Sequence, residues 1–136
     1  MGSRRKAREI ALQMIYSIDV SKSDIKDSLN LYWENNPEEH EVVEFANMLS
    51  TGTKDNLVKI DELITQYTKN WNLKRMASVD RNILRVAIFE LVFYKDTPVN
   101  VVINEAVELA KKFSTSESGG FVNGILDKVK EVREGL

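Results

Sequence analysis

The sequence predicts an all-α protein of about seven helices. Apolar residues recur at helical spacing along most of the chain, helix-capping residues separate these stretches, and no stretch keeps the two-residue alternation of a β-strand. The 136 residues suit one domain, spanning 1–136. Lys69–Asn72 has the character of a junction between an N-terminal subdomain, 1–70, and a C-terminal subdomain, 71–136.

The N-terminal half predicts helices in consecutive stretches. Apolar stripes with helical spacing run over residues 7–18 and again over 25–32. The dipeptide Asn36-Pro37 has the chemistry of an N-cap followed by the first position of a third helix. Gly52 interrupts the pattern that follows, so residues 37–69 are either two helices or one helix kinked at this glycine.

The C-terminal half predicts three more helices. Residues 79–94 become apolar on nearly every face, which is typical of a central helix that is covered on all sides. Glu90 within this stretch therefore needs a buried partner. The dipeptide Thr97-Pro98 predicts an N-cap and first position for a helix that runs through Phe113, and the last helix follows the Ser/Gly-rich residues 114–120.

Composition excludes most catalytic and membrane functions. The chain has no cysteine and a single histidine, His40, so disulfides, thiolate metal sites and His-based triads lack their residues. No glycine-rich phosphate loop occurs, and Glu105 and Glu108 continue a polar helix face. The apolar runs are far shorter than the ~18 residues of a membrane span. We expect a cytoplasmic protein that is not an enzyme and uses no cofactor, metal or membrane.

Positive charge is concentrated at the start of the chain. Residues 1–9 carry four basic groups and one acid, whereas residues 10–68 carry four basic groups and eleven acids. Cations in the first turn of a helix oppose its dipole, so an anionic partner should compensate them. A phosphate backbone is one such partner, and a solubilising basic tail is the alternative. The four basic residues within residues 1–9 are Arg4, Arg5, Lys6 and Arg8.

Two aromatic residues and a glycine-rich helix start extend this prediction. Phe113 lies at the centre of an apolar stripe, so the pattern favours a core position for it. Phe121 lies about 70° from the centre of its own stripe, where a partly exposed ring could stack on an unpaired base. The amides of Ser118, Gly119 and Gly120 would form a phosphate seat at the positive end of that helix. Together these features predict binding to single-stranded RNA.

Charged residues also stand at the start of the most buried helix. Asp80, Arg81 and Arg85 could form a structural ion pair or contact a partner protein, and the sequence favours neither interpretation.

Four segments, in order along the whole chain, resemble the NusB family of bacterial transcription antitermination factors. They are Arg4–Glu9 with Gln13 and Tyr16-Ser17, Asp80–Leu91, Thr97-Pro98 with Val102–Phe113, and Phe121–Asp127. The resemblance implies a fold of two packed helical bundles without catalysis. It also implies binding of boxA elements in nascent ribosomal RNA together with NusE, a small-subunit ribosomal protein, so that RNA polymerase passes terminators.

The resemblance also assigns residues. By position, the RNA contacts map to Arg4, Arg5, Lys6, Arg8, Phe113 and Phe121, and the NusE contacts map to Asp80, Arg85 and Glu117. Gly119-Gly120 stands where some members carry bulkier polar residues, so an RNA contact at Gly120 would be made by its backbone.

Alternative interpretations remain open. One is an adaptor that binds only proteins, and another is a detached NusB-like domain of an RNA cytosine methyltransferase, for whose cofactor-binding sheet the chain has no room before Leu136. The free protein is either a monomer or a homodimer that covers residues 4–8.

Overall fold

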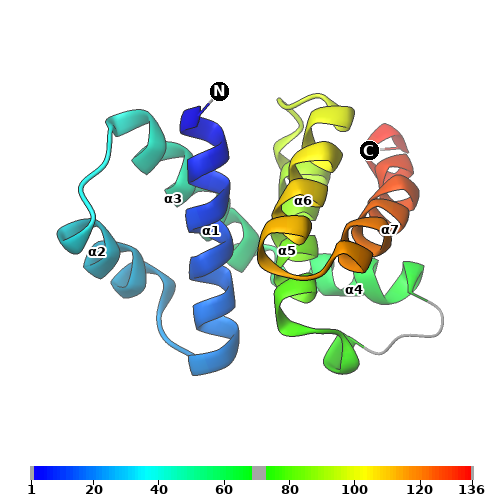
Figure 1. The fold of residues 1–136 in the computed structure, drawn as a ribbon, viewed down its shortest axis with the longest axis horizontal. Coiled ribbons are helices and arrows are strands. Elements are labelled where there is room, and N and C mark those ends of the chain that lie inside the picture. The colour runs from blue at the N-terminus through cyan, green and yellow to red at the C-terminus, as the bar shows by residue number, and fades with distance from the viewer. Residues whose placement is uncertain (1, 69–72, 136) are drawn as a thin grey trace. The chain divides into compact units, whose positions relative to one another are not determined.

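The computed structural model describes residues 2–68 and 73–135, and all regular elements in them are helical (Figure 1). The elements are α1 (Gly2–Ser21), α2 (Ile25–Asn35), α3 (His40–Asp55), α4 (Leu57–Tyr67), a 3₁₀ turn η1 (Leu73–Arg75), α5 (Ser78–Ile88), a π-helical segment η2 (Phe89–Tyr94), α6 (Val99–Phe113) and α7 (Ser116–Gly135). Seven α-helices in this part of the chain confirm the predicted fold class.

The chain divides into two compact units between Asp55 and Asn56. This boundary lies earlier than the expected one between residues 70 and 71, because α4 packs on α5 and α7 and so belongs to the second unit. Ile60 and Ile64 on α4 are completely buried. The expected junction at Lys69–Asn72 lies outside the described residues.

In the first unit, α1 packs along α3, and α2 contacts both. Ala7 and Ala11 are one helical turn apart on α1 and, like Ala46 on α3, have no exposed surface. Side chains this small let two helix backbones approach closely. The first unit is thus a three-helix cluster built around a tight α1–α3 contact.

The start of α3 differs from the prediction. Asn36 was expected to be its N-cap, but both the backbone N–H and the side-chain amide of Asn36 donate to the Tyr32 carbonyl, at 2.9 and 3.0 Å. Asn36 therefore ends α2. Helix α3 begins at His40, and the Glu39 carbonyl accepts from the amides of Val42 and Val43.

The stretch after Pro37 holds two helices, as one of the two alternatives predicted. The break, however, is not at Gly52, through which α3 continues to Asp55. A glycine inside a helix weakens it without ending it, and the helix is interrupted at Asn56 instead, where the backbone is not helical (φ −110°, ψ 18°).

The second unit is built around α5 and η2, with α4, α6 and α7 packed on them. Every residue from Asn82 to Val92 is buried, which confirms the predicted central helix. The sequence did not predict the π-helical turn at its end. The amide of Lys95, which has a positive φ of 65°, donates to the Glu90 carbonyl at 3.2 Å.

The start of α6 also lies one residue later than predicted. Pro98 rather than Thr97 is the N-cap, and its carbonyl accepts from the amides of Val101 and Val102. Thr97 belongs to the preceding connection, where its carbonyl accepts from an Arg133 guanidinium N–H at 2.8 Å. Within residues 2–68 and 73–135, no helix is both long and apolar enough to cross a membrane.

Gly119 sits where α7 packs against α6. A Cβ atom added there would lie 3.4 Å from the side chains of Val107 and Lys111, whereas one added at Gly124 would meet nothing within 4 Å. The α6–α7 contact therefore leaves room for a methyl group at Gly119 and for little more.

We expect Gly119→Leu to lower the free energy of unfolding by about 1–3 kcal/mol, because the larger side chain must displace α6. Gly119→Ala should change it by less than about 1 kcal/mol, since the gain in helix propensity offsets the tight contact. Urea denaturation measures both. Gly124→Leu is the matched control, and an equal loss in that variant would show that the contact with α6 is not the cause.

Candidate nucleic-acid interface

The basic residues at the start of α1 differ in exposure. Arg4, Arg5 and Lys6 are exposed, as a phosphate-binding surface requires. Arg8, predicted as a fourth RNA contact, is only 6% exposed. Its burial leaves three accessible cations in this cluster.

An aromatic ring lies against two of these arginines. The Cζ atoms of Arg4 and Arg8 lie 4.3 and 5.5 Å from the centroid of the Phe45 ring on α3. The face of an aromatic ring is negative and attracts a guanidinium. Part of the compensation for these cations, which the sequence predicted would come from an anionic partner, therefore comes from the Phe45 ring.

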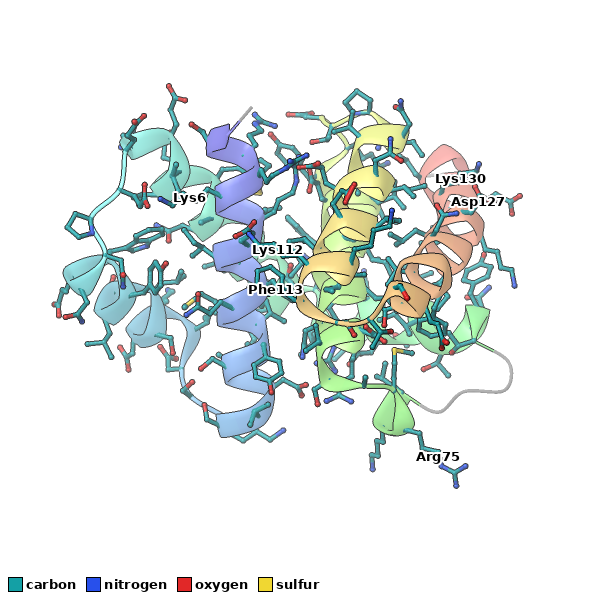
Figure 2. All side chains as sticks on the ribbon, viewed as in Figure 1. Lys6, Arg75, Lys112, Phe113, Asp127 and Lys130 are labelled. Carbon is teal, nitrogen blue, oxygen red and sulfur yellow. The ribbon has the colours of Figure 1, made fainter. Side chains whose placement is uncertain are left out.

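Lys6 has an ionic partner within the chain. Its ammonium group pairs with Glu38 in the segment between α2 and α3, toward which the side chain extends (Figure 2). The hydrogen bond to Glu38 and the charge of that carboxylate raise the pKa of Lys6 above its ordinary value, although desolvation acts in the opposite direction. A phosphate group that approaches Lys6 would have to compete with Glu38.

In the second unit, Phe113 departs from the core position that its apolar stripe favoured. It is the last residue of α6 and is 44% exposed, with the Lys112 ammonium 5.2 Å from its ring centroid (Figure 2). The buried stripe of α6 ends one turn earlier, at Leu109 and Ala110. An exposed ring at this position suits the stacking role that the family resemblance assigned to Phe113.

The start of α7 carries the remaining predicted RNA contacts, Gly120 and Phe121, and the predicted NusE contact Glu117. Phe121 is half-buried, which confirms the prediction of a partly exposed ring, and Gly120 and Glu117 are exposed.

The predicted phosphate seat at the start of α7 does not have all three of its predicted amide donors available. The Ser118 amide donates to the Thr115 carbonyl at 3.1 Å and approaches the Thr115 hydroxyl at 3.2 Å, so it is not available to a ligand. Gly120 is the fifth residue of α7, beyond the first turn, whose amides have no partner within the helix.

Arg85 is held inside the second unit. Its Nε and Nη2 atoms donate to the two carboxylate oxygens of Asp61 on α4, at 2.8 and 2.9 Å, and its Nη1 donates to Asn82 at 3.0 Å. Arg85 is 7% exposed, and a fork-to-fork pair is the strongest geometry for these groups. This geometry favours the structural ion pair over the partner contact.

Asp80 is similarly enclosed, at 9% exposed, and accepts a 3.0 Å hydrogen bond from the Ser118 hydroxyl. This bond ties the start of α5 to the start of α7. Of the three predicted NusE contacts, Glu117 is the one that is exposed.

Comparisons with known proteins agree with this architecture. The sequence model described as the NusB family matches residues 5–131. The chain belongs to the NusB family. A transcription antitermination protein NusB from Anaeromyxobacter dehalogenans strain 2CP-1 is 51% identical over 131 residues, which cover 95% of this chain and 92% of that protein. The protein of the same name from Thermodesulfovibrio yellowstonii is 42% identical and is covered over 90% of its length.

Solved structures of the family share the fold. The T. maritima NusB structure has a TM-score of 0.87 at 38% identity, over 94% of this chain and 90% of that one. A chain in the crystal structure of the antitermination factors NusB and NusE in complex with dsRNA also has a TM-score of 0.87, at 27% identity, over 96% of this chain and 98% of that one.

We expect Asp61→Asn to lower the free energy of unfolding by roughly 2–3 kcal/mol, because a buried guanidinium would lose its counter-charge and face an amide N–H group. Thermal and urea denaturation measure the loss. Asp127→Asn is the control, since Asp127 pairs with Lys130 on the exposed surface of α7 and should contribute less than about 1 kcal/mol (Figure 2). Wild-type stability of the Asp61 variant would argue against a structural role for Arg85.

Proposed function

We propose that the protein is an RNA-binding transcription antitermination factor that acts together with NusE. The observation that carries this proposal is its membership of the NusB family, with relatives named for antitermination and a relative solved with NusE and RNA. Antitermination is a binding function rather than catalysis, and the protein is accordingly not an enzyme.

Side chains in both units support an RNA ligand. In the first unit, Arg4, Arg5 and Lys6 are exposed cations that can meet phosphate groups. In the second unit, Phe113 offers an exposed ring and Phe121 a partly exposed one, and such rings stack on unpaired bases. We propose that the RNA is single-stranded and of the boxA type found in ribosomal RNA transcripts.

The proposal extends to the assembly in which the protein acts. Bound to boxA RNA and NusE, it would join the antitermination complex of RNA polymerase on nascent transcripts, which places it in the cytoplasm. A homodimer that covered residues 4–8 would compete with RNA for the same cations, so RNA binding and self-association should oppose each other.

Salt dependence tests the electrostatic part of this function. Three accessible cations, at about −0.7 per phosphate contact on a single strand, give an expected log–log slope of about −2. The measurement is a titration of a short boxA RNA at several salt concentrations, with scrambled RNA, a matched duplex RNA and matched DNA for comparison. Arg5→Glu should weaken binding more than Lys128→Glu, which reverses an exposed charge on α7. Binding that ignored salt would contradict the proposal.

Substitution of the two rings separates an RNA-binding protein from an adaptor that binds only proteins. Phe113→Ala and Phe121→Ala should each lose roughly 1–3 kcal/mol of RNA affinity through lost base stacking. Because Phe113 is exposed, its variant should keep wild-type stability within about 1 kcal/mol. Val101→Ala, which removes an exposed apolar side chain near the other end of α6, is the control. If both ring variants still bind NusE and their RNA affinity is unchanged, the result favours an adaptor that binds only proteins.

A further inference from the structure

We propose that Phe45 is a positioning residue for RNA binding, which holds the Arg4 guanidinium in place for a phosphate group. This inference rests on the proposed function and assigns a role to a residue on α3 that itself need not touch RNA. Phe45 is 8% exposed, so its ring is fixed in the core of the first unit. Arg4, which lies 4.3 Å from the ring centroid, is exposed.

The chemistry of the two groups allows both contacts at once. A guanidinium attracted to an aromatic ring interacts through its planar face, whereas its five N–H donors lie in its plane and point outward. A ring beneath Arg4 therefore leaves donors that can bind a phosphate oxygen in a forked geometry. A carboxylate partner would occupy these donors instead.

The contrast with Lys6 makes Arg4 the better prepared cation. Lys6 already pairs with Glu38 and would have to exchange one anion for another. Arg4 forms no ion pair with a carboxylate in the described part of the chain. Within those residues, its guanidinium makes a cation–π contact with the Phe45 ring. Arg4 can thus gain a phosphate partner without losing an ionic one.

Positioning affects affinity because long side chains lose freedom when they bind. Immobilising one such side chain at an interface costs roughly 0.5–1.5 kcal/mol, which corresponds to about two- to tenfold in affinity. Because the Phe45 ring already restricts Arg4 in the free protein, the side chain loses less conformational freedom when RNA binds.

The test is a double-mutant cycle in the full chain, measured with a short boxA RNA at several salt concentrations. Phe45→Leu, which keeps an apolar side chain, should weaken binding about two- to tenfold and reduce the magnitude of the salt slope by about 0.7, the share of one phosphate contact. The double variant Phe45→Leu/Arg4→Gln should bind no more weakly than Arg4→Gln alone. Phe89→Leu is the matched control, because Phe89 is also 8% exposed but lies in the second unit.

The outcomes separate this inference from the function on which it rests. Wild-type affinity and slope in Phe45→Leu, or independent losses from the two substitutions, would overturn the role of Phe45 while RNA binding itself stood. Absence of RNA binding by the wild-type chain would overturn the proposed function as well. If Phe45→Leu does not fold, pentafluorophenylalanine at position 45 keeps the ring's shape and reverses its charge distribution. Weakened binding is expected there too, and unchanged binding would overturn the inference.

Discussion

Burial of α5 and η2 on all sides requires that their polar groups find partners inside the second unit. Arg85 meets this requirement by pairing with Asp61 on α4. Asp80 meets it with one carboxylate oxygen, since Oδ2 accepts from Ser118 on α7 while the buried Oδ1 has no hydrogen-bond donor among the described residues. Asn82 donates to the Ser78 carbonyl at 2.8 Å and accepts from Arg85. The bonds of Arg85 and Asp80 link α4 and α7 to the central helix, in agreement with the place of α4 in the second unit.

In the first unit, the cations at the start of α1 are stabilised in a different way. They lie at a helix start, where the dipole disfavours them, and the fold offsets them partly with the Phe45 ring and partly with Glu38. These two partners leave the cations in unequal states. An arginine on a ring keeps its N–H donors, whereas a lysine in an ion pair must first release its carboxylate. Affinity for an anionic polymer thus depends on which internal partner each cation has, as well as on how many cations there are.

Periodicity predicted the helices well, since the apolar stripes of α1 and α5 are long and strong. Helix ends were harder to predict, because residues such as Asn36 and Pro98 can belong to either side of a helix boundary. For the site, the partial exposure of Phe121 followed from its angle on the helix. The exposure of Phe113 did not, because it depends on α6 ending there. The roles of Asp61, Glu38 and Phe45 depend on contacts between helices, which one sequence does not reveal.

The contacts of α7 also constrain the order in which the chain can fold during synthesis. Residues of the first unit contact one another without α7, so that unit can form while the ribosome is still translating the rest. The second unit cannot, because α7 packs on α4, α5, η2 and α6. Arg133, near its end, donates to the carbonyls of Lys95 and Thr97 and closes the connection before α6. Until α7 has been synthesised and has left the ribosome, the faces of α4, α5 and α6 that it covers in the folded protein remain exposed.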